Sequence, residues 1–140
     1  MPKAKYTVLL ADDSEDDRLF MRRALLRTTR LVMIGEVCDG EEAIDYLSGV
    51  GAYSDREKFP LPDVLLLDLK MPRKTGYEVL EWLQTQSLDG LVVVVVSGSF
   101  LPEDITRSLA LGADAYQQKV ALKDEQEGMV REIENLLDKS

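Results

Sequence analysis

The sequence contains no histidine and only one cysteine, Cys38. An intrachain disulfide therefore cannot form, and the chain cannot supply a Cys/His zinc site, a Ser-His-Asp triad or a phosphohistidine. Any chemistry that the chain carries must use carboxylates, hydroxyl groups and lysines.

Long hydrophobic runs and an excess of positive charge are also missing. The longest apolar run, Leu91–Val96, is far shorter than the roughly 20 residues of a membrane-spanning helix. The first 13 residues contain no secretory cleavage pattern. The 17 Lys and Arg against 26 Asp and Glu leave a net charge of −9, which repels nucleic-acid phosphates and anionic lipids. We therefore expect a cytoplasmic protein that binds neither nucleic acid nor a membrane.

The length and composition fit one folded domain. A chain of 140 residues with 45% hydrophobic residues is long enough to bury a single core without disulfides. The sequence shows no internal repeat, low-complexity tract or flexible linker. We expect one domain over residues 1–140, with no output domain.

Short apolar runs alternate with helical patterns along the chain. Strands are expected at Thr7–Ala11, Val32–Ile34, Val64–Leu67 and Leu91–Val96, with a weaker one from Ala115 to near Lys119. Helices are expected over Glu15–Leu26, around Ala43–Leu47 up to Gly49, around Val79–Leu83, from Pro102 to Gly112 and around Met129–Leu137. Such alternation predicts an α/β domain, a doubly wound five-stranded parallel sheet built as (βα)5.

Two of these helices have apolar positions that we expect to face the core. They are Leu19, Phe20, Ala24 and Leu25 in the first helix, and Met129, Ile133, Leu136 and Leu137 in the last. The polar connection from Val50 to Pro62 is longer than usual for this architecture. It is either a family-specific elaboration or an extended helix end, and the sequence assigns it no role.

Polar residues follow the strands where an open parallel sheet binds its ligands. They are Asp12 and Asp13, Asp68, Ser97 and Lys119. Clustered carboxylates repel one another, and Mg²⁺ or protonation of one carboxyl relieves the repulsion. A carboxylate beside such a metal can act as the nucleophile of phosphoryl transfer, and Asp68 is the candidate because it leaves the central strand. Lys119 and Ser97 suit the phosphoryl oxygens.

Each of these residues has an ordinary structural explanation when it is taken alone. An aspartate before a helix usually caps that helix, and a single lysine is usually solvated. A tyrosine such as Tyr116 near a strand end usually packs its ring against neighbouring side chains and leaves its hydroxyl at the surface. Ser14 and Asp17 form a capping-box pattern, so Asp12 and Asp13 are not needed as caps. The combination at successive strand ends is what indicates a phosphoryl site.

The combination resembles the receiver domains of CheY-like response regulators. The matching elements are Asp12-Asp13, Asp68-Leu69-Lys70-Met71-Pro72 with Gly76, Ser97-Gly98, and Tyr116 three residues before Lys119. The resemblance covers essentially the whole chain and implies the flavodoxin-like strand order 2-1-3-4-5. The long connection also resembles that of single-domain regulators paired with cyanobacterial phytochromes.

The resemblance implies a role for each matching residue. Asp68 would be the phosphoacceptor and Tyr116 the aromatic switch that follows Ser97. Magnesium would be held by Asp12, Asp13, Asp68 and the backbone carbonyl of Lys70, and the phosphoryl group would be contacted by Ser97, Gly98 and Lys119.

The resemblance also implies partners. A sensor histidine kinase or a histidine phosphotransfer protein would phosphorylate the domain. An unidentified protein target would then bind the face formed by the fourth helix, fifth strand and fifth helix. The only chemistry would be self-phosphorylation and self-dephosphorylation, so the chain would not be an enzyme for an external substrate. Homodimer formation is left open.

The sequence departs from the family pattern at the fifth strand. Val120 stands where family members usually have a proline after the lysine, which leaves open whether the Lys119–Val120 peptide is cis. Gln117 and Gln118 occupy strand positions that are more often apolar. A receiver-like interaction module that works without phosphate is therefore an alternative.

A second alternative is a Mg²⁺-dependent phosphohydrolase with an aspartyl nucleophile. Such enzymes place a second aspartate two residues beyond the nucleophile, and this sequence has Lys70 there. Glycine-rich nucleotide-binding loops are absent after every predicted strand.

Overall fold

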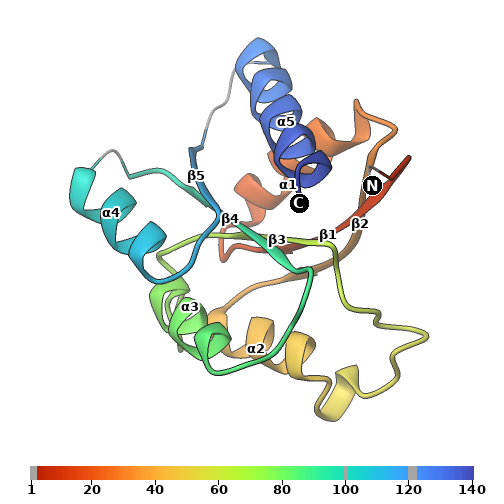
Figure 1. The fold of residues 1–140 in the computed structure, drawn as a ribbon, viewed down its shortest axis with the longest axis vertical. Coiled ribbons are helices and arrows are strands. Elements are labelled where there is room, and N and C mark those ends of the chain that lie inside the picture. The colour runs from red at the N-terminus through yellow and green to blue at the C-terminus, as the bar shows by residue number, and fades with distance from the viewer. Residues whose placement is uncertain (1–2, 100, 120–122) are drawn as a thin grey trace.

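The structure is a computed structural model that describes residues 3–99, 101–119 and 123–140. Within these residues, strands and helices alternate along the chain (Figure 1). The strands are β1 (Tyr6–Ala11), β2 (Leu31–Val37), β3 (Val64–Leu67), β4 (Val92–Ser97) and β5 (Ala115–Gln118). The α-helices are α1 (Glu15–Leu26), α2 (Gly40–Ser48), α3 (Gly76–Gln84), α4 (Pro102–Ala110) and α5 (Lys123–Asp138). A short 3₁₀ helix, η1 (Gly51–Tyr53), follows α2.

The strands form one parallel sheet in the order β2-β1-β3-β4-β5, which confirms the predicted fold class. Helices α1 and α5 cover one face of the sheet, and α2, α3 and α4 lie on the other (Figure 1). Strands β3 and β4 are buried along their whole length, as expected for apolar strands covered on both sides.

Side chains alternate between two cores, one on each face of the sheet. Val8 and Leu10 of β1 pack into the core under α1 and α5, and Leu9 and Ala11 pack into the core under α2 and α3. This period of two is the geometry of a strand. The two cores hold the strands rigidly, so the residues that follow the strand ends have fixed positions.

Two sequence expectations about the elements were wrong in detail. Strand β2 extends through Val37 rather than ending at Ile34, and its register against β1 shifts between Val8 and Leu9. In α1 the stripe of Met21, Ala24 and Leu25 is buried, and Phe20 is 44% exposed because it lies one residue off that stripe.

The connection after α2 is a packed elaboration and not an extension of the helix. Gly49 ends α2 as predicted, with a positive φ of 74° that a side chain would strain. The rings of Tyr53 and Phe59 then pack against Tyr46 of α2, with ring centroids 4.9 and 6.0 Å from that of Tyr46.

Arg56 fixes this connection to the end of α2. Its guanidinium donates hydrogen bonds to the carbonyl oxygens of Tyr46 and Leu47, both at 2.7 Å, and of Phe59 at 3.1 Å. The C-terminal carbonyls of a helix lack most intrahelical donors, so Arg56 adds a donor for Leu47 and a second one for Tyr46, which also accepts from the N–H of Gly49. No helix in the described ranges combines the length and apolarity needed to cross a membrane.

Candidate functional site

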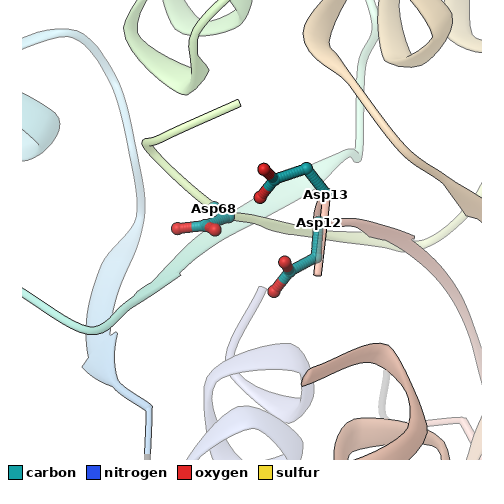
Figure 2. A group of neighbouring side chains, drawn as sticks. All are labelled: Asp12, Asp13 and Asp68. Carbon is teal, nitrogen blue, oxygen red and sulfur yellow. The ribbon is translucent and has the colours of Figure 1, made fainter. Parts of the chain in front are cut away.

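The sheet brings the predicted aspartates together at its carboxyl edge. Ala11 and Leu67 are register partners in the adjacent strands β1 and β3, and Asp68 N–H donates to the carbonyl of Ala11 at 3.0 Å. Asp12 and Asp13 therefore leave β1 beside the point where Asp68 leaves β3 (Figure 2). One carboxylate oxygen from each of these aspartates lies within 4.8 Å of the others. Asp12 is 4% exposed and Asp68 6%, whereas Asp13 is exposed.

Lys119 lies at the same edge and binds the acidic cluster from the end of β5. Its Nζ lies 2.8 Å from Asp12 Oδ2, 3.0 Å from Asp68 Oδ2 and 2.7 Å from Asp17 Oδ2. Burial alone lowers the pKa of Lys119, but the hydrogen bonds to Asp12 and Asp17 and the charge of Asp68 raise it well above its usual range. The lysine is thus a fixed positive charge in the site.

The carboxylate of Asp68 has two different environments. Its Oδ1 accepts a hydrogen bond from the N–H of Leu69 at 2.8 Å, and its Oδ2 accepts from Lys119. Burial raises the pKa of Asp68 above its ordinary value, with Lys119 opposing this effect and the charge of Asp12 adding to it. The carboxylate is therefore poorly solvated, a condition that favours its use as a nucleophile or as a cation ligand.

Asp17 is a site residue that the sequence analysis assigned to a different role. Its N–H donates to Ser14 Oγ as the capping pattern predicts, but its carboxylate binds Lys119 instead of returning to Ser14. The N–H of Ser14 donates to Asp12 Oδ1 at 2.9 Å, so Asp12 does take part in capping, contrary to the prediction. The only sequence signal for Asp17 was its place in the first turn of a helix that starts at the site.

A backbone hydrogen bond joins Ser97 to Lys119. The N–H of Lys119 donates to the carbonyl of Ser97 at 2.8 Å, and Ser97 Oγ accepts from the N–H of Ser99 at 3.2 Å. The hydroxyl of Tyr116 donates to the carbonyl of Ser99 at 3.1 Å. The predicted switch pair is thus joined through Ser99, whose own hydroxyl donates to Asp104 of α4.

The remaining residues that the sequence singled out are exposed, half-buried or outside the described ranges. Gly98 has open space where a side chain would stand, in keeping with an open approach to the site. Lys70 is exposed, and the role of its carbonyl stays a prediction. Val120, and with it the conformation of the Lys119–Val120 peptide, lies outside the described residues. Gln117 and Gln118 are half-buried in β5.

The acidic cluster fits a hard divalent cation. Mg²⁺ binds oxygen ligands at about 2.0–2.1 Å in octahedral geometry, so its ligand atoms lie up to about 4 Å apart. The 4.8 Å spread of the oxygens of Asp12, Asp13 and Asp68 needs only small side-chain movements to reach that geometry. Two of these residues are buried beside each other, and a cation would relieve their repulsion.

Comparison with known proteins identifies the family to which the chain is similar. The family model of the response regulator receiver domain matches residues 8–134. The chain is 34% identical over 113 residues to response regulator Rcp1 of Synechocystis sp., covering 80% of this chain and 75% of Rcp1. It is also 34% identical over 113 residues to the nitrate/nitrite response regulator protein NarL of Escherichia coli (strain K12), covering 81% of this chain. The match covers 47% of NarL, so the chain spans about half the length of that relative.

Solved structures match over nearly the full length of the chain. The phosphorylated cyanobacterial phytochrome response regulator RcpA superposes with a TM-score of 0.81 at 32% identity, covering 98% of this chain and 97% of RcpA. The Mn²⁺-bound form of Rcp1 superposes with a TM-score of 0.79 at 30% identity, covering 96% of each chain. The expected similarity to phytochrome-associated regulators is therefore confirmed.

A five-stranded parallel sheet in this order, with an acidic cluster and a lysine at its carboxyl edge, defines a receiver domain. The chain belongs to the response regulator receiver domain family, which works in two-component signalling. Receiver domains bind Mg²⁺ or Mn²⁺ in such an acidic pocket and interact with sensor histidine kinases.

Proposed function

We propose that this domain is a switch that is controlled by phosphorylation of Asp68. The observation that carries the proposal is the buried carboxylate of Asp68, which lies 3.0 Å from the ammonium group of Lys119 and within the acidic cluster. The donor is a phosphohistidine of a sensor histidine kinase or a histidine phosphotransfer protein. Residues 1–140 contain no histidine, so the donor group lies outside them.

The transfer is a displacement at phosphorus. A carboxylate oxygen of Asp68 attacks, an O–P bond forms and the P–N bond of the donor breaks. The electron pair of that bond goes to the imidazole nitrogen, which takes up a proton from solvent. Lys119 then donates to one phosphoryl oxygen and the hydroxyl of Ser97 to another, with the backbone N–H of Gly98 beside them. Because these donors sit on rigid strand ends, they need little reorganisation.

Asp12, Asp13, Asp68 and the carbonyl of Lys70 are the residues that would hold Mg²⁺. When bound, the ion supplies positive charge that neutralises the phosphoryl oxygens and the carboxylates around them. The fit rests on the donor set, which consists of hard oxygen ligands with two buried carboxylates.

Ser97 and Tyr116 couple the phosphorylation of Asp68 to a change at the protein surface. Donation from the Ser97 hydroxyl to a phosphoryl oxygen shifts its contact with the N–H of Ser99, and the hydroxyl of Tyr116 holds the same residue by its carbonyl. The affected surface is the face of α4, β5 and α5, where an unidentified protein target binds. Exposed Leu101 and Leu109 give this face an apolar component on the α4 side.

The wider proposal is that residues 1–140 act as one cytoplasmic receiver domain. Its only turnover is phosphorylation and dephosphorylation of Asp68. A phosphohydrolase for external substrates is disfavoured because Lys70, which has no carboxylate, stands two residues after Asp68. A module that never carries phosphate is disfavoured by the intact cluster of carboxylates and lysine.

Intact-protein mass spectrometry tests the proposal. The protein is incubated with phosphoramidate, a small P–N donor, with and without Mg²⁺, beside Asp68→Asn and the control Asp89→Asn. Asp89 is an exposed aspartate in the turn before β4, and Ser97 of the site lies at the opposite end of that strand. We expect one added phosphoryl group in the wild type and Asp89→Asn, only with Mg²⁺, and none in Asp68→Asn. Addition without metal, or to Asp68→Asn, would overturn the proposal.

A further inference from the structure

The ammonium group of Lys119 donates to three carboxylates that do not have equal roles. An ammonium has three protons, and Asp12, Asp17 and Asp68 accept them at 2.7 to 3.0 Å. Asp12 and Asp68 belong to the cluster that fits a divalent cation, and Asp17 lies outside that cluster. A cation bound there competes with Lys119 for the oxygens of two of its three acceptors.

Charge repulsion adds to this competition. A divalent cation close to an ammonium group repels it, and burial strengthens the repulsion because little water screens it. Lys119 is needed in the site, since its charge is the one fixed cation that the described residues provide next to Asp68. It must therefore keep one contact when the cation takes over Asp12 and Asp68.

Asp17 is placed rigidly for this contact. It lies in the first turn of α1, where its N–H is bound by Ser14 Oγ at 3.2 Å, and the N–H of Ser14 is bound in turn by Asp12. The backbone of Asp17 is thus held close to the acidic cluster, and its carboxylate accepts the hydrogen bond from Lys119. Its side chain is 38% exposed and that of Lys119 is 22% exposed, so water does not fully screen the pair.

The structure also has room for the ammonium on the Asp17 side. Asp12, Asp17 and Lys119 border a small cavity of about 30 Å³, whose apolar wall is formed by Met21, Ala24 and Met129. This volume is close to that of one water molecule. Free space therefore adjoins both the Lys119 side chain and Asp17, with Gln126 also in its lining.

We propose that Asp17 is a positioning residue that retains Lys119 in the site when a divalent cation occupies Asp12 and Asp68. The retained ammonium is then ready to meet a phosphoryl oxygen on Asp68. The inference deepens the proposed function and rests on it for the phosphoryl step. The contact between Asp17 and Lys119 in the cation-bound protein can be tested without any phosphodonor.

The first test observes the Lys119 ammonium group by NMR in protein with ¹⁵N-labelled lysine. The signal is assigned by its loss in Lys119→Gln, and Mg²⁺ alone is added. We expect the wild type to keep a protected signal at saturating Mg²⁺. Asp17→Asn should show it without metal, through Asp12 and Asp68, and lose it when Mg²⁺ is added. This metal-dependent loss separates positioning from misfolding.

The matched control is Asp16→Asn. Asp16 lies in the same first turn of α1, is exposed and makes no ion pair within the described residues. Its substitution removes the same charge from the helix N-terminus. We expect it to behave as the wild type. If Asp17→Asn keeps the signal with Mg²⁺, or Asp16→Asn loses it equally, the proposal is wrong.

The second test measures the phosphorylation rate with phosphoramidate at saturating Mg²⁺. A partly exposed ion pair contributes up to about 1 kcal/mol, so Asp17→Asn should be about three- to fivefold slower and Asp16→Asn should change less than about twofold. In a Lys119→Gln background, Asp17→Asn should add less than about a twofold loss. An unchanged or faster rate, or an equal loss without Lys119, would overturn the positioning role. If the wild type takes no phosphoryl group, the proposed function fails while the NMR test still decides the contact.

Discussion

A Cβ atom on Gly76 would lie 2.2 Å from the backbone carbonyl oxygen of Asp68. The N–H of Gly76 also donates to the carbonyl of Leu69 at 2.9 Å, so the start of α3 packs directly on the backbone that carries the candidate phosphoacceptor. Only a residue without a side chain fits there. This steric restriction explains why glycine stands at position 76 of the motif that begins at Asp68.

Gly76→Ala is expected to destabilise the fold. The added methyl must push the turn after β3 away from α3, and such overpacking costs about 1–3 kcal/mol. Urea denaturation measures the loss. Gly128→Ala is the matched control, because nothing lies within 4 Å of its Cβ position in the interior of α5. This control should gain about 0.5–1 kcal/mol through helix propensity, and a loss as large as that of Gly76→Ala would contradict the steric account.

Mg²⁺ is expected to stabilise the folded protein through the acidic cluster. A ligand that binds only the folded state adds about 2.7 kcal/mol at a hundred times its dissociation constant. Asp13→Asn should abolish most of this gain, because Asp13 is one of the three clustered carboxylates. Asp16→Asn should retain it. Thermal unfolding with increasing Mg²⁺ provides the measurement, and equal stabilisation of both variants would place the cation elsewhere.

Asp63 is expected to make stability depend on acidic pH. Burial raises the pKa of Asp63, but hydrogen bonds from Thr7 and Lys3 outweigh this effect and bring the pKa below its ordinary value of 3.8. The folded state thus favours the carboxylate, whose stabilisation is present above pH 3.8 and lost as pH falls through the folded pKa.

Asp63→Asn removes this charge-assisted contact, which includes the Thr7 N–H at 2.9 Å. At pH 7 the substitution should lower the free energy of unfolding by about 1 kcal/mol. The difference from the wild type should shrink below pH 3.8, in a urea series at several pH values. Asp89→Asn, at an exposed turn, serves as the control. A difference that is constant with pH would show that the carboxylate charge is not responsible.

Arg56→Lys is expected to loosen the connection between α2 and β3. Lysine keeps the charge but cannot donate to three carbonyl groups in the planar arrangement that Arg56 uses. The unfolding free energy should fall by about 1–2 kcal/mol, and limited proteolysis should cut within residues 50–62 sooner. Arg131→Lys, on the exposed side of α5, should have neither effect. Unchanged proteolysis in Arg56→Lys would argue that the aromatic contacts alone hold the connection.

The sequence was most informative where chemistry and periodicity coincide. Apolar strands such as Val64–Leu67 are buried on both faces, and the sheet fixes the position of the residue that follows each strand. The proximity of Asp68 and Lys119 could therefore be predicted from the sequence. Parallel topology makes adjacent strand ends meet at one edge, which is why the acidic cluster of Asp12, Asp13 and Asp68 was predictable.

The sequence-based predictions were wrong or incomplete where the rotation of a helix or a contact between distant residues determines which side chains are buried or paired. Phe20 and Met21 are adjacent apolar residues about 100° apart on α1, and only packing determines which one faces the sheet. Asp17 was assigned to a local capping pattern, but its partner, Lys119, is distant in the sequence. The order in the long connection depends on Arg56 reaching back to carbonyls of α2, a contact that no local pattern contains.

The central claim is that Asp68 carries the phosphoryl group, and trapping the acyl phosphate tests it most directly. Borohydride reduces an aspartyl phosphate to homoserine, which peptide mass mapping locates in the chain. After treatment with phosphoramidate and Mg²⁺, the account expects homoserine at position 68 and at no other aspartate. Homoserine at Asp12, Asp13 or Asp17, or no reduced residue in protein that has gained a phosphoryl group, would contradict it.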